Sequence, residues 1–316
     1  MLTGLDVFCG AGGSSAGGRA AGIRMVGAID MCPIATATYK ANFPQARVIT
    51  SRLEDVNVSD LKRDIGSIDI LLASPECTNH TCAKGARPRD ENSRATAMQV
   101  VRFARAFRSR WLVLENVVHM RPWSRYEELK NDLTQLGYRL GEQVLDASQF
   151  GVAQSRRRLF LVGDRERAPR LALPPRSVRQ KIAESILDPE GRWKTTPLYA
   201  SGRAHGTLQR ALRGLEVLGA DESFLIVYYG TDGSGGWQPL NRPLRTITTI
   251  DRFALVRPSK NGPMMRMLQV PELKRAMGFD RTFVLPVGTR RERIKLLGNG
   301  VCPPVMRSVV EALTAP

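Results

Sequence analysis

The chain has 316 residues, 42% of them hydrophobic and 6% aromatic, and no apolar run approaches the roughly 18 residues that would cross a bilayer. Its length suffices to bury a substantial core, in one large domain or two smaller ones. The 47 Lys and Arg residues against 30 Asp and Glu give a formal charge of +17, which favours a nucleic acid partner over a merely basic surface.

Cysteine and histidine usage indicates a reducing, cytoplasmic setting without a structural metal. The five cysteines are odd in number and scattered, which argues against a disulfide framework. The three histidines are not spaced from a cysteine pair as in a zinc finger, so we expect no metal site. Residues 1–6 lack the basic and apolar regions of a secretory signal, and export is therefore not expected.

Short apolar runs alternate with helix-like stretches in the first half of the chain. This rhythm is typical of βαβ units, and it predicts an α/β fold with a doubly wound, mostly parallel sheet. The predicted strands cover residues 4–8, 24–29, 69–73, 111–114 and 158–163, the last as the second strand of a hairpin-like pair.

The rhythm stops after Gly163, where prolines punctuate an arginine-rich stretch that extends to about Gly236. This composition predicts a smaller, irregular second domain, to which we assign residues 164–261. Helical patterns return later in the chain, so residues 262–316 are expected to rejoin residues 1–163 in the first domain. The last helix should pack back on that domain.

A glycine-rich loop follows the first predicted strand and opens a helix. Glycines allow a tight turn and a close approach to a ligand, and the helix N-terminus offers free N–H groups, so the loop is a candidate cofactor site. Asp30, at the end of the second strand, is placed to accept hydrogen bonds from ribose hydroxyls. Packing alone is the alternative for the loop, and a helix N-cap is the alternative for Asp30.

Cys77 lies just past the carboxyl end of a buried strand, where open α/β sheets place their sites. A lone cysteine is more often a small core residue. Glu115, at the end of the next strand, supplies a possible chemical partner, because it would project an acid into the same crevice. A nucleophilic thiolate therefore becomes a hypothesis to set against simple packing.

Four segments in this order resemble the DNA cytosine-5 methyltransferase family: the glycine loop, Pro75-Glu76-Cys77, Glu115-Asn116-Val117 and Gln154-Ser155-Arg156-Arg157-Arg158. Arg94, residues 242–249 and residues 298–304 match as well. Only residues 164–240 have no family pattern, and the family keeps its variable target-recognition segment there. The resemblance implies a Rossmann-like enzyme that uses S-adenosylmethionine on double-stranded DNA, with residues 1–163 and 262–316 as catalytic domain and 164–261 as target-recognition domain.

The resemblance also implies roles for the residues of the site. Cys77 would add to carbon 6 of a cytosine flipped out of the duplex, and Glu115 would be the acid at ring nitrogen N3. Arg158 is expected at the cytosine O2 and Arg156 in support of the acid. Phosphate binding by the basic triplet is the alternative, a role that Arg157 would take on the opposite side of the extended segment. The base that removes the carbon 5 proton is not identified.

Larger sets of residues are assigned to the cofactor and the DNA. The resemblance maps the S-adenosylmethionine pocket to Phe8, Gly10, Gly12, Gly13, Asp30, Met31, Asp55, Pro75, Asn299 and Val301, with Asp55 reading the adenine amino group and Met31 replacing a common stacking aromatic. Cations expected to bind DNA are Lys84, Arg87, Arg89, Arg94, Arg157, Arg242 and Arg245. Candidates for reading bases are Trp193, His205, Tyr228, Tyr229 and Trp237.

The loop of residues 78–97 follows the nucleophile and carries several of these cations. We expect it to close over the extruded nucleotide, the alternative being a merely flexible, solvated loop. Glu76 is the clearest departure from the family, which commonly has proline there, because a carboxylate facing the pocket would disfavour the thiolate.

Three rival functions stay open. They are RNA cytosine-5 methylation, although the Cys-Phe-Thr tripeptide of that branch is absent, a catalytically silent DNA-binding relative, and transfer of a modified methyl group. The sequence further suggests a monomer of bacterial or phage type, associated with the nucleoid, with a restriction endonuclease as a possible cellular partner. It does not reveal the recognised DNA sequence.

Overall fold

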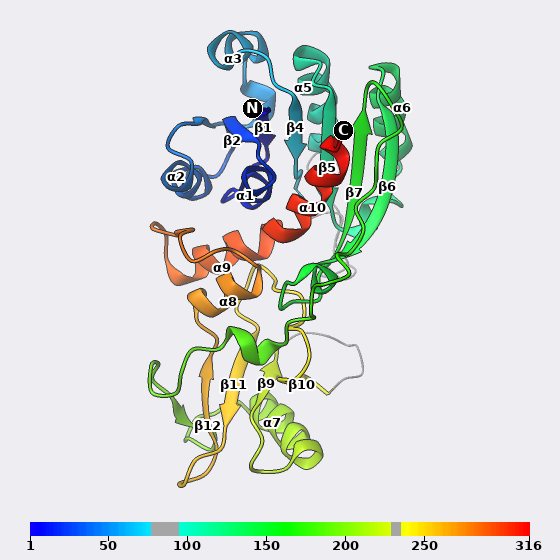
Figure 1. Cartoon of the computed structure of the whole chain (residues 1–316). Helices are drawn as coiled ribbons and strands as arrows, with labels where there is room; N and C mark the ends of the chain where they lie inside the picture. The colour runs from blue at the N-terminus through cyan, green and yellow to red at the C-terminus, as the bar shows by residue number, and fades with distance from the viewer. Residues whose placement is uncertain (77–94, 229–234) are drawn as a thin grey trace.

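The computed structural model describes residues 1–76, 95–228 and 235–316. Within them the chain builds two sheets, one in each half of the molecule (Figure 1). A seven-stranded sheet has the strand order β3-β2-β1-β4-β5-β7-β6, and a five-stranded sheet has the order β10-β9-β11-β12-β8. The predicted α/β class is confirmed, and the second sheet adds an antiparallel layer to it.

The seven-stranded sheet is mostly parallel. Strands β1 to β5 run parallel to one another, whereas β7 is antiparallel to both β5 and β6, so the predicted hairpin is confirmed. The strands are β1 (Thr3–Val7), β2 (Arg24–Asp30), β3 (Arg47–Thr50), β4 (Ile70–Ala73), β5 (Trp111–Asn116), β6 (Arg139–Asp146) and β7 (Arg157–Asp164).

Helices cover both faces of this sheet, because alternate side chains of a strand point to opposite sides. Ile70 and Leu72 of β4 join a core with α1 (Gly13–Ala20), α2 (Pro33–Asn42) and α10 (Pro303–Thr314). Leu71 and Ala73 join a second core with α3 (Val58–Ile65), α5 (Gln99–Phe107) and α6 (Tyr126–Gln135). Short 3₁₀ turns are η1 (Leu53–Asp55), η3 (Thr96–Met98), η4 (Val118–Met120), η5 (Ala147–Phe150) and η6 (Ala183–Ile186).

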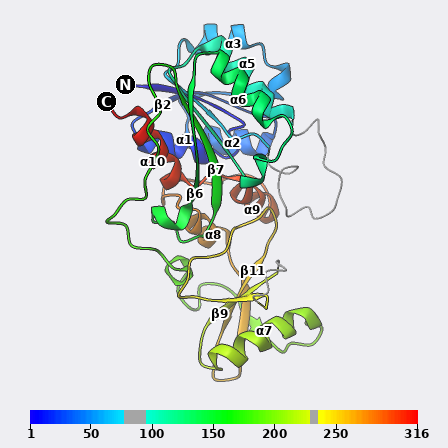
Figure 2. The same ribbon diagram turned by 90° about the vertical axis from the view of Figure 1, so that its right-hand side faces the viewer.

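The five-stranded sheet carries one helix, α7 (His205–Leu218), on one face (Figure 2). Its strands are β8 (Thr196–Pro197), β9 (Phe224–Val227), β10 (Trp237–Pro239), β11 (Phe253–Arg257) and β12 (Met264–Met267). Ala211 of α7 packs against Phe224, Ile226 and Ala254. The second sheet thus extends through β12, past residue 261 where the sequence placed the domain boundary.

Three helices lead the chain back to the first domain: α8 (Val270–Ala276), α9 (Arg290–Asn299) and α10. The prediction that the last helix packs back is confirmed, since α10 lies on α1 so closely that a Cβ on Gly17 would stand 2.6 Å from Cβ of Met306. Across the part of the chain that the structure describes, no helix combines the length and apolar character of a membrane span.

A buried ion pair fastens the two halves together. Arg266 of β12 donates to both carboxylate oxygens of Glu272 in α8, at 2.6 and 2.7 Å. Glu272 also accepts the backbone N–H groups of Asp188 and Gln269, at 2.9 and 2.7 Å. Arg275 of α8 reaches the Asp188 carboxylate at 2.7 Å. The joint is therefore a network in which the buried carboxylate of Glu272 has all its oxygens bonded.

Candidate active site at the carboxyl edge of the seven-stranded sheet

The carboxyl ends of β4 and β5 meet at one edge of the sheet, because the two strands are parallel neighbours. The side-chain amide of Asn116, at the end of β5, donates to the carbonyl of Pro75 at 3.1 Å. This bond fixes the start of the segment that leads from β4 through Glu76 to residue 77. Cys77 itself lies outside the described residues, as do Lys84, Arg87, Arg89 and Arg94.

Glu115 supplies the acidic side chain of the site at this edge. Its side chain is buried, with 5% of the residue exposed, and its Oε1 lies 3.2 Å from Nε of Arg158. Burial raises the pKa of Glu115, while the charges of Arg158 and Arg156 oppose that rise. The structure thus brings two predicted site residues together. A carboxyl group with a raised pKa keeps its proton to higher pH, which suits a proton donor.

The arginines of the triplet lie in different environments. Arg156 is buried and donates to three backbone carbonyls, those of Ile247 at 3.0 Å, Gly298 at 2.7 Å and Gly300 at 2.9 Å. It therefore ties the start of β7 to the segment between β10 and β11 and to the C-terminal end of α9, and its charge still acts on Glu115. Arg157 is exposed, as its predicted phosphate-binding role requires.

Gln154 is a residue whose role the sequence did not show. It is fully buried, its side-chain oxygen accepts the N–H of Ile247 at 2.8 Å, and its amide donates to the carbonyl of Ala276 at 3.3 Å. It heads the segment that contains the arginine triplet, which was the available signal. Together with Arg156 it holds residue 247 against the site.

The glycine loop is shaped as a cradle. Gly10 and Gly12 have φ angles of 50° and 97°, in the left-handed region that favours glycine. A Cβ on Gly10 would meet no atom within 4 Å, so the loop is open at that point. Phe8 also has a positive φ, 58°, and backbone strain in a residue other than glycine is typical of ligand sites.

Asp30 anchors this loop from the end of β2. Its two carboxylate oxygens accept the N–H groups of Gly10 at 2.9 Å and Cys32 at 2.8 Å. The N-cap of α2 is Cys32, so Asp30 is not that cap. Burial raises the pKa of Asp30, the two N–H groups lower it, and the charge of Glu76 raises it. Glu76 therefore acts on the predicted cofactor side of the edge.

The remaining predicted cofactor residues lie around the same edge. Gly13 meets the C-terminal motif, since a Cβ on it would stand 2.3 Å from the carbonyl oxygen of Val301. Val301 is buried and Asn299 is exposed. Met31, after β2, is 62% exposed, and Asp55 ends the 3₁₀ turn after β3. Gly13 thus serves packing directly, whatever it also does for a ligand.

A buried series of hydrogen-bonded side chains beneath the glycine loop was not predicted from the sequence. Ser15 donates to the Asp6 carboxylate at 2.6 Å and shares a hydrogen bond of 2.7 Å with the Tyr39 hydroxyl. Burial raises the pKa of Asp6 to about 7. This series joins β1, α1 and α2, and so it holds the cradle in shape.

The described residues expected to contact DNA in the second half are exposed or half-buried. Arg242 and His205 are exposed, and Trp237 and Arg245 are half-buried. Tyr228 is half-buried and shares a hydrogen bond of 3.3 Å with Thr207, whereas Tyr229 lies outside the described residues.

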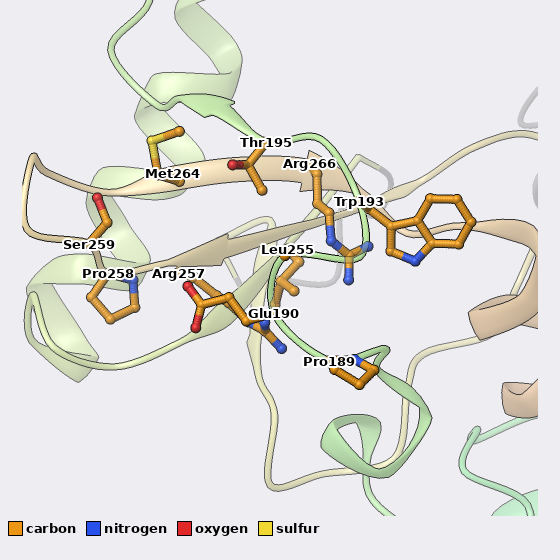
Figure 3. Close-up of a pocket in the computed structure, with 11 residues that line it drawn as sticks. Pro189, Glu190, Trp193, Thr195, Leu255, Arg257, Pro258, Ser259, Met264 and Arg266 are labelled. Carbon is orange, nitrogen blue, oxygen red and sulfur yellow. The ribbon is translucent and has the colours of Figure 1, made fainter.

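A cavity of about 170 Å³ opens in the second half, on the face of the five-stranded sheet away from α7 (Figure 3). Leu255 and Met264 line it, and their positions alternate with Ala254 and Met265, which face α7. Trp193 stands on one side of the cavity in Figure 3 and Met264 on the other. The cavity lies apart from Glu115 and holds only Trp193 of the predicted site residues.

Comparison with known proteins shows the family of this chain. Residues 2–315 match the family model of the C-5 cytosine-specific DNA methylases. The chain belongs to this family. It is 32% identical over 194 residues to the type II methyltransferase M.XorII of Xanthomonas oryzae pv. oryzae, a match that covers 58% of this chain and 46% of the relative. The chain therefore spans less than half the length of several of the relatives that it matches.

Other relatives match along the whole chain. The type II methyltransferase M.NlaX of Neisseria lactamica is 26% identical over 326 aligned positions, covering 98% of this chain and 96% of the relative. The fold resembles that of a Spodoptera frugiperda DNMT2 mutant, with a TM-score of 0.71, 16% identity and 99% of each chain covered. The Entamoeba histolytica methyltransferase EhMeth gives a TM-score of 0.70 at 16% identity, covering 99% of this chain and 98% of that protein.

Proposed function

We propose that this protein methylates carbon 5 of cytosine in double-stranded DNA, with Cys77 as covalent nucleophile. One observation carries the proposal: a buried acid, Glu115, is paired with Arg158 at the strand end that Asn116 ties to Pro75, two residues before the cysteine. A thiol nucleophile and an acid at one crevice are what addition to an electron-poor ring requires.

The first chemical step is addition to the ring. The Cys77 thiolate forms a bond from sulfur to carbon 6, and the displaced electron pair moves toward N3, where Glu115 delivers its proton. The product is an enamine whose carbon 5 is nucleophilic. Arg158 lies against the carboxyl group that donates and so orients it. Its predicted contact with the cytosine O2 would place both groups on one edge of the base.

The residues of the cradle fit the methyl donor. Asp30 has both oxygens held by backbone N–H groups and therefore points in a fixed direction, and the loop at Gly10 is open. Phe8, Gly10, Gly12, Asp30 and Val301 would hold S-adenosylmethionine, with Gly13, Met31, Asp55, Pro75 and Asn299 around them. When bound, S-adenosylmethionine supplies the electrophilic methyl group.

The last step releases the methylated base and regenerates the free thiolate. A base takes the proton from carbon 5, the electrons of that bond re-form the double bond to carbon 6, and the sulfur leaves as thiolate. Glu115 takes back the N3 proton. No residue of the described chain is assigned as the base.

The DNA partner follows from charge and family. A formal charge of +17 attracts the phosphate backbone, and Arg157, Arg242 and Arg245 are proposed to contact it. Residues 1–163 and 262–316 would form the catalytic domain and residues 164–261 the recognition domain, with β12 completing its sheet. Since the relatives include type II methyltransferases, a restriction endonuclease is a candidate cellular partner.

Methyl transfer to mixed-sequence DNA tests the proposal. Purified protein is incubated with S-adenosylmethionine labelled in its methyl group and either bacterial genomic DNA or transfer RNA, and the nucleosides are then separated. We expect label in 5-methyldeoxycytidine with the wild type and none with Cys77→Ala. Label in transfer RNA but not in DNA would favour the RNA alternative, and no label in either would contradict enzyme activity.

A further inference from the structure

A much smaller cavity lies beside Glu115. Its volume is about 10 Å³, and it is lined by Glu115, Leu145, Ala147, Arg156, Arg158, Phe160, Val301, Cys302 and Val305. Space of this size holds about one water molecule. The walls come from β5 to β7 and the start of α10, whereas Pro75 and the glycine loop do not line it.

The cavity has the polar lining that a water needs. Oε1 of Glu115 accepts no hydrogen bond from the residues that the structure describes, although Nε of Arg158 lies 3.2 Å away. Leaving a buried oxygen without a hydrogen bond is costly, by about 1–3 kcal/mol. Three residues with polar side-chain atoms, Arg156, Arg158 and Cys302, line the same space. A buried water typically makes two to four such bonds.

The backbone at the N-terminal end of α10 cannot supply the hydrogen-bond donor that Oε1 of Glu115 lacks. Pro303 and Pro304 occupy its first two positions and have no N–H, while the N–H groups of Val305 and Met306 bond to the carbonyl of Cys302. Cys302 itself is buried, and burial raises the pKa of its thiol to about 11. It therefore stays a neutral thiol, which is a weak donor and a small side chain.

We propose that this cavity binds one water molecule that donates a hydrogen bond to Glu115, and that Cys302 is a positioning residue for the acid because its small side chain leaves the room. The inference rests on the proposed function for its catalytic consequence. The water holds one carboxyl oxygen in place, so that the carboxyl group keeps a single orientation toward the base. The hydrogen bond from the water also favours the charged carboxylate form of Glu115. The charges of Arg158 and Arg156 act in the same direction, whereas burial opposes the charged form.

Three variants separate volume from sulfur chemistry. Cys302→Val fills the cavity from the α10 side, and Ala147→Val fills it from η5 while keeping the thiol. Cys302→Ser keeps both the small volume and a donor. We expect both valine variants to lower kcat about tenfold, the equivalent of one hydrogen bond, with KM for S-adenosylmethionine unchanged. The alkaline limb of the pH profile of kcat/KM should move to higher pH in both valine variants, because Glu115 without the water has a higher pKa.

The conservative variant and the folding control complete the test. Cys302→Ser should retain most of the wild-type kcat and its pH profile, and thermal unfolding shows that each variant is folded. Wild-type kcat and pH profile in Cys302→Val and in Ala147→Val would overturn the proposal. Equal loss in Cys302→Ser and Cys302→Val would also overturn it, since the sulfur and not the space would then matter.

A crystal structure at high resolution tests the water independently of activity. Density for one water within about 3.2 Å of Oε1 of Glu115 is expected in the wild type and not in Cys302→Val. An empty cavity in the wild type would overturn the inference even if methylation is found. Conversely, a bound water in a protein without methyl-transfer activity would uphold the site and refute only the proposed function.

Discussion

Two buried pairs of glutamate and arginine lie in different regions of the molecule and differ in how completely they are bonded. At the joint between the halves, Glu272 receives two bonds from Arg266 and two from backbone N–H groups. At the sheet edge, Glu115 faces Arg158 through one 3.2 Å contact, and its Oε1 accepts no hydrogen bond from the described residues. A fully bonded pair is structural, whereas an incompletely bonded buried acid can still accept a hydrogen bond from a further partner, such as the proposed water.

Removing the acid at the sheet edge should have the largest effect on activity. Glu115→Gln keeps the shape but cannot deliver a proton, so kcat/KM for methyl transfer should fall by about 10²–10⁴. Its free energy of unfolding should stay equal or rise, because the variant no longer buries an ionisable carboxyl group. Steady-state methylation and denaturant unfolding measure the two quantities. Activity within tenfold of the wild type would remove Glu115 from the mechanism.

The opposite pattern is expected at the joint. Glu272→Gln leaves the buried guanidinium of Arg266 without its counter-charge, and breaking a buried pair in this way costs about 3–5 kcal/mol of unfolding free energy. Denaturant unfolding measures the loss. Glu128→Gln is the matched control, since Glu128 pairs with Arg125 at the surface, and it should unfold like the wild type. If both variants unfold alike, the joint is not held by the buried pair.

A third buried acid sharpens the comparison through pH. Asp6 also has one oxygen, Oδ1, without a hydrogen bond from the described residues, and its pKa is raised from 3.8 to about 7 by burial. The folded state therefore binds the proton more tightly than the unfolded state, so stability from this group is present at low pH and lost as the pH rises toward 7. Asp6→Asn should remove that loss.

Unfolding measured from pH 4 to pH 8 checks this expectation. The stability of Asp6→Asn relative to the wild type should grow with pH up to about 7 and then level off. A relative stability that is flat over the whole range would mean that the Asp6 carboxyl titrates alike in the folded and unfolded chain.

The smallest effect is expected at Glu76. Its charge raises the pKa of Asp30, so the two carboxylates repel each other on the cofactor side of the edge. Glu76→Gln should lower KM for S-adenosylmethionine about twofold and leave kcat unchanged, as expected for one partly solvated charge interaction. Glu76→Pro tests the residue that the family commonly has. Unchanged constants in both variants would exclude any role of Glu76 in binding or catalysis.

Much of the first sheet could be predicted, because buried parallel strands are continuous apolar runs. The strand β3 was missed, since none of its four residues is fully buried: the outer two are exposed and the middle two half-buried, so they give no such run. The helix α7 was missed because prolines and arginines dominate the composition around it. Its apolar stripe acquires meaning only against β9 and β11, which follow it in the sequence.

The site was predictable where chemistry determines residue type, and less so where packing does. Glu115 and Arg158 were found from motifs at strand ends, and the structure pairs them. The carbonyl partners of Arg156 could not be foreseen, because they lie 91 to 144 residues away along the chain. Cys302 carried no spacing signal, and only the fold places it beside the acid.

Covalent trapping tests the central claim most directly. Duplex DNA of mixed sequence, in which 5-fluorocytosine replaces every cytosine, is incubated with the protein and S-adenosylmethionine and then run on a denaturing gel. Fluorine cannot leave carbon 5 as a proton does, so the sulfur bond to carbon 6 should persist. We predict a protein–DNA complex that survives denaturation with the wild type and is absent with Cys77→Ala. A wild type that runs as free protein, or a complex that persists in Cys77→Ala, would contradict the account.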